Sequence, residues 1–86
     1  MILGVVIKYK DTLIALSKPN RHMDCVLHGY LNLGYKDCKS SKISAGGFYT
    51  ETVKFMDRVT ALEYAKKHNQ LINKQANTML FSEDLW

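Results

Sequence analysis

The sequence predicts an α+β fold: one small domain over residues 1–86, with the element order ββαββα and a C-terminal tail docked onto it. Within the first 17 residues, Leu3, Val5, Ile7 and Tyr9 recur at every second position, as in a strand, and an apolar run resumes over residues 12–16. Two later segments repeat apolar residues at helical spacing. A chain of 86 residues is too short for two hydrophobic cores, so a single domain is expected.

Two strands are predicted before residue 18. Apolar positions alternate over residues 3–9 and resume over residues 12–16, with Lys10 and Asp11 between them. Pro19 then ends the second strand, and Asn20 is a favourable N-cap for a helix that follows. The first third of the chain therefore predicts a hairpin that leads directly into a helix.

The first helix is expected to bury one apolar stripe. Its large apolar residues fall at i, i+3, i+4, i+7 and i+8, namely Met23, Val26, Leu27, Tyr30 and Leu31. Gly34 is expected to end this helix. Residues 35–46 are rich in Ser, Lys and Gly and predict a mobile loop, and residues 47–55 predict a second hairpin with Phe48, Val53 and Phe55 as its apolar positions.

Asp57 is expected to cap a second helix that begins at Arg58. Its buried face is predicted to contain Ala61, Leu62 and Ala65, and Glu63 and Lys67 are spaced for an ion pair on its outer face. Polar residues 73–78 predict a loop. Residues 79–86 are too apolar to remain in solvent, so this tail is expected to pack on the sheet or on a second subunit.

The net charge of +4 is uneven along the chain. Residues 1–45 carry seven basic and three acidic side chains, whereas residues 46–86 carry five of each. A basic half suggests an anionic partner, although the same lysines would also serve solubility. No run approaches the ~18 apolar residues of a membrane span, and the two cysteines make no disulfide framework. We also expect no signal peptide, because the N-terminus lacks a basic start, an apolar stretch and a small-residue cleavage site. A cytosolic protein with no membrane partner is therefore expected.

Metal binding and catalysis receive little support. His22, Cys25 and His28 lie three residues apart on the first helix and Cys38 follows, but this spacing matches no standard zinc finger. The chain lacks a phosphate-binding loop after Gly46-Gly47, a nucleophile elbow and the His-x-Ser/Thr pairs of small phosphoesterases. We therefore expect no enzyme, no metal, no cofactor and no catalytic residue.

Basic residues at the starts of the two helices predict a phosphate-binding pocket. Backbone N–H groups at a helix N-terminus favour an anion, and arginine adds bidentate hydrogen bonds. Aromatic residues on the adjacent strand would stack on a base, although the core is the simpler place for Phe48. The candidate ligand-binding residues are Asn20, Arg21, His22, Phe48, Tyr49, Lys54 and Arg58.

The segment from Gly47 to Arg58 and the closing run Leu80-Phe81-Ser82-Glu83-Asp84-Leu85 resemble a signature of small phage proteins, the anti-Thoeris sponge family. Residues 19–22, Pro-Asn-Arg-His, are also similar to the start of that family's first helix. The sequence departs from the signature at Val53, where the family has a turn glycine, and at Lys54, where it has an arginine. Lysine keeps the charge but loses the bidentate fork.

This resemblance implies a phage protein that acts in the host cytoplasm. Members of that family bind cyclic ADP-ribose-type or cyclic nucleotide signals without cleaving them and so block antiviral signalling. By position, Lys54 and Arg58 would hold phosphate oxygens, and Phe48 would lie near the base.

A homodimer or higher homo-oligomer is expected, because a chain of this size encloses little volume alone. The alternative function is a basic module that binds nucleic acid or inhibits a host protein through the lysine-rich loop Lys36 to Lys42. A small phosphodiesterase acting on the same signals is the third hypothesis.

Overall fold

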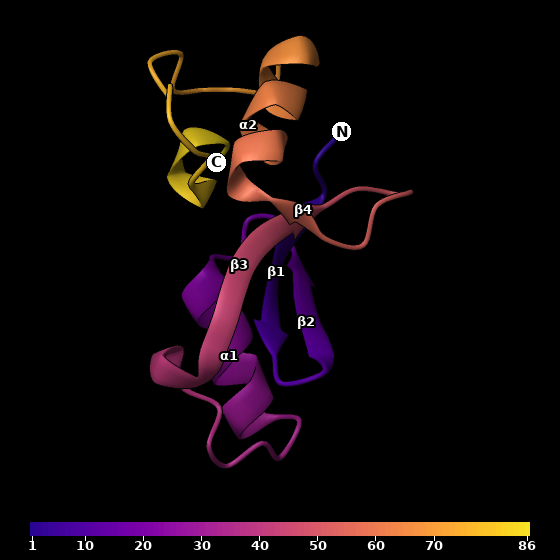
Figure 1. The fold of residues 1–86 in the computed structure, drawn as a ribbon, viewed down its shortest axis with the longest axis vertical. Helices are drawn as coiled ribbons and strands as arrows, with labels where there is room; N and C mark the ends of the chain where they lie inside the picture. The colour runs from indigo at the N-terminus through magenta and orange to yellow at the C-terminus, as the bar shows by residue number, and fades with distance from the viewer.

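The computed structural model describes residues 1–86 and is built on one four-stranded antiparallel sheet. The strands are β1 (Gly4–Tyr9), β2 (Thr12–Ser17), β3 (Ile43–Tyr49) and β4 (Met56–Asp57). Their order across the sheet is β2-β1-β3-β4, so β1 is a central strand and β2 is an edge strand (Figure 1). The predicted α+β class, with a docked tail, is confirmed.

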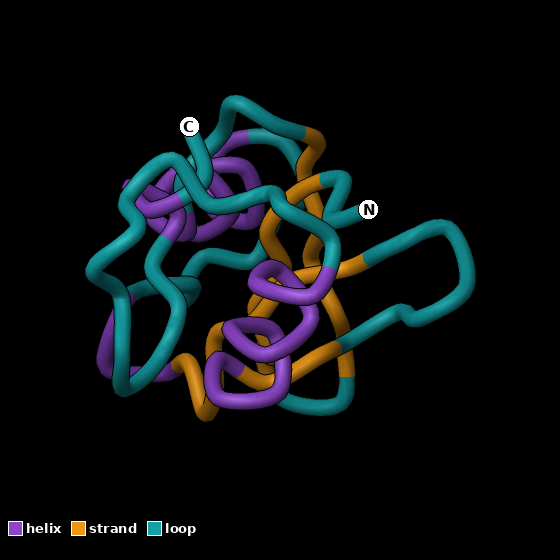
Figure 2. Tube along the Cα trace, turned by 90° about the horizontal axis from the view of Figure 1, so that it is seen from above, coloured by secondary structure: helices purple, strands orange, loops and turns teal.

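Two helices lie in different places relative to this sheet. α1 (His22–Leu31) packs on one face of β1 and β2, whereas α2 (Arg58–Lys67) continues beyond the end of β3 (Figure 1). After α2 the chain is loop except for a short 3₁₀ helix, η2 (Ser82–Asp84), and a second one, η1 (Ser40–Lys42), precedes β3 (Figure 2). The molecule is therefore elongated, 38 Å by 23 Å by 20 Å. Neither helix has the length and apolar character needed to cross a bilayer.

The strand register divides the sheet into two faces. Val5 pairs with Phe48 and Ile7 pairs with Gly46, and paired residues point to the same side. Val6 alternates with them and therefore points to the opposite side. The face that carries Val5, Ile7 and Phe48 lies under α1 and holds the hydrophobic core. Below, these are called the helix face and the open face.

The prediction for the buried side of α1 is wrong. Cys25, Val26 and Gly29 face the sheet, and of the five predicted residues only Val26 is buried. The other four are exposed: Met23, Leu27, Tyr30 and Leu31. The reason is close packing, since a Cβ on Gly29 would lie 2.7 Å from the Cys38 sulfur and 2.9 Å from Ile14 Cδ1.

The N-cap prediction also needs correction. Arg21 occupies the N-cap position, and its backbone N–H donates to Asp24 Oδ2 at 2.7 Å. The Asn20 side chain instead donates to the Ser17 carbonyl at 2.8 Å and so closes the turn before the helix. At the other end, α1 stops at Leu31, and Gly34 has a left-handed backbone with φ of 76°, which glycine adopts readily.

The middle of the chain contains more strand than predicted. β3 begins at Ile43, so only the first part of the expected loop over residues 35–46 is loop. The second hairpin is correspondingly reduced, because β4 contributes only Met56 and Asp57 and pairs with Gly47 and Phe48. Residues 50–55 form a connection that projects from the sheet, and residues 51–54 within it are exposed (Figure 1). The sequence did not predict this strand, because residues 44–47 are small and show no alternation of apolar and polar side chains.

The second helix and the tail agree with their predictions. Asp57 caps α2 by accepting the Thr60 N–H at 2.8 Å, and Ala61, Leu62 and Ala65 are buried. The tail packs into the core through Leu80 and Leu85. The expected ion pair between Glu63 and Lys67 is not formed, since the only salt bridges are Met1–Glu51, Lys10–Asp37 and Arg21–Glu83.

Candidate functional site

A cleft of about 250 Å³ opens between α1 and β3 on the helix face. Its floor is apolar and comes from Ile7, Val26 and Ile43. Its polar groups come from three separate elements: His22 at the start of α1, Ser40 in η1 and Arg58 at the start of α2. An apolar floor with a few convergent polar groups is the usual composition of a small-molecule site.

His22 is held in place by two contacts at the first turn of α1. Its Nε2 lies 2.7 Å from the Gly47 carbonyl oxygen, and its ring meets the Phe48 ring edge-on with centroids 5.1 Å apart. Burial lowers the pKa of His22, and the nearby Arg58 lowers it further, while the Gly47 hydrogen bond and Glu83 act in the opposite direction. The imidazole is therefore a neutral donor to the Gly47 carbonyl at neutral pH.

Arg58 enters the cleft from the first residue of α2. Its Nη1 donates to the Leu80 carbonyl at 2.9 Å, and its guanidinium carbon lies 5.3 Å from the centroid of the Phe81 ring. Burial lowers the pKa of Arg58, partly offset by the charge of Glu83. Arg58 forms no salt bridge, because Glu83 is paired instead with Arg21 at 3.6 Å. The cleft thus contains a half-buried cation without a bound carboxylate.

Gly46 keeps the cleft open. A Cβ at this position would lie 3.0 Å from Arg58 Nη2 and 3.2 Å from His22 Cδ2, so any side chain would occupy the space between them. Without a side chain, Arg58 Nη2 faces the cavity and can donate to an anion that enters it. This arrangement can bind a phosphate or carboxylate by charge-assisted hydrogen bonds. It contains no nucleophile paired with a base.

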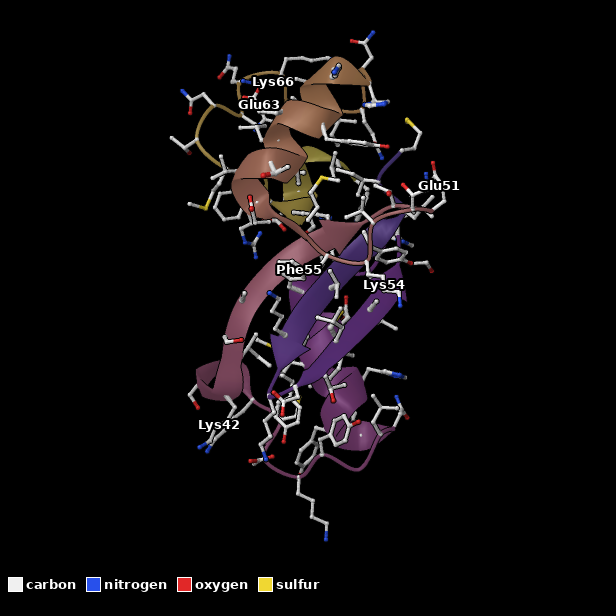
Figure 3. The ribbon with its side chains drawn as sticks, turned by 45° about the vertical axis from the view of Figure 1, so that its right-hand side comes forward. Lys42, Glu51, Lys54, Phe55, Glu63 and Lys66 are labelled. Atoms are coloured by element: carbon white, nitrogen blue, oxygen red, sulfur yellow. The ribbon has the colours of Figure 1, made fainter.

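Two of the predicted residues lie on the opposite side of the sheet. Tyr49 and Lys54 line a separate hollow of about 210 Å³ on the open face, with Val6 as its floor. Figure 3 shows Lys54 and Phe55 together in front of the strands. The Phe55 ring lies over Gly47 and carries Lys8 Nζ 4.4 Å from its centroid. The resemblance implied that Lys54 and Arg58 both hold phosphate oxygens, but Lys54 does not line the cleft that contains Arg58.

Phe48 does not reach the surface at all. Its side chain is 0% exposed and belongs to the core cluster, together with residues of α1 and of the tail. The expectation that Phe48 lies near a base is therefore corrected, and the core interpretation of this residue holds. Its ring packs edge-on against the His22 ring.

Asn20 and Arg21 are used to attach the tail. The Trp86 indole N–H donates to the Asn20 carbonyl at 3.1 Å, and Arg21 Nη1 donates to Ser82 Oγ at 3.1 Å. Together with the Arg21–Glu83 ion pair, these contacts join the start of α1 to η2. Of the seven predicted residues, the structure brings only His22 and Arg58 together in one cleft.

The four residues considered as zinc ligands do not converge. His28 hydrogen-bonds Asn32 on the outer side of α1, whereas Cys25 and Cys38 are buried free thiols. Burial raises the pKa of Cys25 to about 11 and also raises the pKa of Cys38, so both stay protonated. No group of three His, Cys, Asp or Glu side chains is placed to hold a metal ion.

Sequence reasoning missed the residues that shape the cleft. Gly46, Ser40 and Ile43 line it but carried no motif, because residues 35–46 predicted a loop. One signal was present, since two adjacent glycines inside a strand indicate a close approach by another group. Here Gly46 accommodates Arg58, and Gly47 accommodates the Phe55 ring.

The fold and the cleft define a small α+β domain with one half-buried cation in a partly apolar cleft. The chain belongs to the phage T4 y16D protein family, whose sequence model matches residues 1–86. It is thus a phage protein. Comparison with curated proteins and with solved structures gave no match.

Proposed function

We propose that this phage protein binds a small phosphate-bearing host signal, of the cyclic nucleotide or cyclic ADP-ribose type, in the cleft between α1 and β3. It sequesters the molecule in the host cytoplasm and does not cleave it. The observation that carries the proposal is Arg58, a half-buried guanidinium with a free Nη2 edge and no carboxylate partner.

The surroundings of Arg58 support an anionic ligand. Burying a cation is costly unless it is paired, so a phosphate that enters the cleft would recover interaction energy that the free protein lacks. Gly46 leaves room for the phosphate, and the apolar floor offers a surface for a ribose or base. At about 250 Å³ the cleft holds part of such a ligand, and the remainder would extend across the exposed Met23.

Binding without turnover agrees with the groups that line the cleft. Ser40 and His22 both line it, but no hydrogen bond joins their side chains, so the serine has no paired base. The resemblance of residues 80–85 to the sponge signature supports the same class of ligand.

Isothermal titration calorimetry with cyclic ADP-ribose isomers and cyclic di- and trinucleotides tests the proposal. We expect one of these ligands to bind the wild type and to bind Arg58→Ala at least tenfold more weakly, which is the loss of one charge-assisted hydrogen bond, about 1.4 kcal/mol or more. Lys54→Ala is the matched control, because it removes a cation from the open face and should leave the affinity unchanged.

The fate of the ligand separates sequestration from catalysis. After heat denaturation of the complex, chromatography should return the ligand unchanged. A hydrolysed product would favour the phosphodiesterase hypothesis, and equal binding by wild type and Arg58→Ala would refute this cleft as the site. Binding of oligonucleotides alone, with a steep salt dependence, would favour the basic nucleic-acid module instead.

A further inference from the structure

Glu83 is the only acidic residue whose charge acts on the cleft. Burial lowers the pKa of both Arg58 and His22, and the charge of Glu83 opposes this lowering in each. Glu83 belongs to η2 and follows Leu80 by three residues, and the Leu80 carbonyl accepts from Arg58 Nη1 at 2.9 Å. The docked tail therefore places a carboxylate within electrostatic reach of the half-buried guanidinium.

Two groups hold the Glu83 carboxylate away from Arg58. Ser82 Oγ donates to Glu83 Oε1 at 2.8 Å, and Arg21 Nη1 lies 3.6 Å from the same oxygen. Arg21 Nη1 also donates to Ser82 Oγ at 3.1 Å, so the three side chains form one connected cluster. The side chains of Arg21 and Glu83 are 40% and 70% exposed, and an ion pair as exposed as this one is weak. The position of the carboxylate therefore depends on a contact that is easily lost.

Arg58 is the alternative cation for this carboxylate. It is half-buried, it forms no salt bridge, and its Nη2 lies beside the opening that Gly46 leaves. A half-buried cation interacts more strongly with an anion than an exposed cation does, because water screens it less. Without Arg21, the Glu83 carboxylate would be attracted to Arg58 and would compete there with an anionic ligand.

We propose that Arg21 keeps the cleft accessible to its ligand by holding Glu83 away from Arg58, and that Glu83 becomes an internal competitor when this contact is lost. The inference rests on the proposed function, because it concerns the affinity for the anion that Arg58 binds. Arg21 is a positioning residue, since it does not line the cleft and acts on the ligand through Glu83. The apparent affinity then falls with the fraction of molecules in which Arg58 is free.

The chain contains two arginines, Arg21 and Arg58, and this permits a test that needs no ligand. In Arg21→Ala the single arginine Nε–Hε resonance of the NMR spectrum belongs to Arg58, and in the wild type Arg58 gives the resonance that Arg58→Lys removes. We expect the Arg58 resonance to shift in Arg21→Ala and to return to the wild-type position in the double variant Arg21→Ala/Glu83→Gln. An Arg58 resonance that stays at the wild-type position in Arg21→Ala would overturn the inference.

Titration with inorganic pyrophosphate, followed by the same resonance, measures the effect on anion binding. Arg21→Ala should bind about fivefold more weakly than the wild type, because Glu83 then occupies Arg58 in most molecules. Glu83→Gln should restore the affinity of Arg21→Ala but change that of the wild type less than about twofold, because Arg21 already holds the carboxylate away. Arg21→Lys should bind like the wild type. Lys18→Ala is the matched control, since it removes the same charge from a residue that forms no ion pair.

The outcomes separate this inference from the proposed function. Additive effects of Arg21→Ala and Glu83→Gln, or a loss in Arg21→Ala that Glu83→Gln does not restore, would overturn the role of Arg21 and leave the Arg58 site standing. A Glu83-dependent shift of Arg58 in the free protein, without binding of any anion, would refute the proposed function and support the contact. Circular dichroism should show each variant folded. Arg21→Gln, whose amide can still donate to Ser82 Oγ, gives the same comparison if Arg21→Ala loses structure.

Discussion

Arg58 and Leu80 are joined by two hydrogen bonds of opposite direction. The Leu80 N–H donates to the Arg58 carbonyl at 3.0 Å, and Arg58 Nη1 donates to the Leu80 carbonyl at 2.9 Å. One residue begins α2, and the other begins the docked part of the tail, so this contact fixes the tail against the helix. The residue proposed to bind ligand therefore also supports the fold.

Arg58→Ala should lower the free energy of unfolding by about 1–3 kcal/mol, because the Leu80 carbonyl loses a charged donor in a partly buried position. Arg58→Lys should recover part of this loss, since an ammonium can still donate to that carbonyl. Urea denaturation followed by circular dichroism measures both values. Equal stability of the alanine variant and the wild type would show that the tail is held without this contact.

Gly46→Ala should separate binding from stability. The added Cβ would lie 3.0 Å from Arg58 Nη2, which is the mobile end of a long side chain, so the fold should tolerate it within about 1 kcal/mol. Ligand affinity should fall, because the methyl group occupies the opening of the cleft. Calorimetry and thermal denaturation measure the two effects on the same samples.

Gly4→Ala provides the contrasting control. A Cβ at Gly4 would lie 2.7 Å from Tyr49 Cε1 and would also meet the backbone of β2. Backbone cannot move away cheaply, so this variant should lose more stability than Gly46→Ala. An equal loss of unfolding free energy in the two variants would contradict the expectation that the cleft accommodates a methyl group at Gly46.

Stability should fall as the pH is lowered through the titration of His22. Burial lowers the pKa of His22 in the folded state, so between that value and the unfolded value near 6.5 the unfolded chain binds more protons. The contribution of neutral His22 is present above about pH 6.5 and is lost below it. Urea midpoints measured between neutral and mildly acidic pH should show this decline, and His22→Gln should reduce it.

His28→Gln should leave that decline in place. His28 lies on the outer side of α1 and hydrogen-bonds only Asn32, so it is the matched histidine control. A pH dependence that disappears with His28 instead of His22 would contradict the burial argument.

Both thiols should be unreactive in the folded protein. Cys25 is 0% exposed and has a pKa of about 11, and Cys38 is also buried, so little thiolate is present or accessible. Alkylation by iodoacetamide at pH 8, followed by mass spectrometry, should be slow without denaturant and rapid in its presence. Rapid native labelling of either thiol would contradict the packing of α1 against β2.

Leu80→Ala should cost about 2–5 kcal/mol, because it creates a cavity in a fully buried position. Phe81→Ala removes the exposed neighbour and should cost much less, while it also removes the ring beside Arg58. Thermal denaturation of the two variants compares the buried and exposed positions directly. Similar losses would indicate that the tail is not anchored through Leu80.

The elements with strong local signals were predictable. The apolar pattern of residues 3–16 predicted β1 and β2, and Asp57 predicted the start of α2. The apolar character of residues 79–86 predicted that the tail packs on the domain. The buried side of α1 was not predictable, because hydrophobicity favours Met23 and Leu27, whereas close packing selects the small residues Cys25 and Gly29. Tertiary packing overrides the apolar stripe in this helix.

The candidate site was only partly predictable for a related reason. Lys54 and Arg58 are four residues apart in sequence, but the turn into β4 puts them on opposite faces of the sheet. Arg21 was also expected at the site, and it is instead neutralised by Glu83 from the tail. Such pairings depend on where distant segments meet, which local sequence does not encode.

The central place of β1 in the sheet has a consequence for how fast the protein folds. β2 joins β1 through a tight turn, but Val5 must find Phe48, which follows α1 and a loop in the sequence. Closing so long a segment lowers the chain entropy before the contact between Val5 and Phe48 can stabilise the fold. Folding is slower when the contacting residues are farther apart in the sequence. The β1–β2 hairpin should therefore form early, and the arrival of β3 should complete the core and open the cleft beside it.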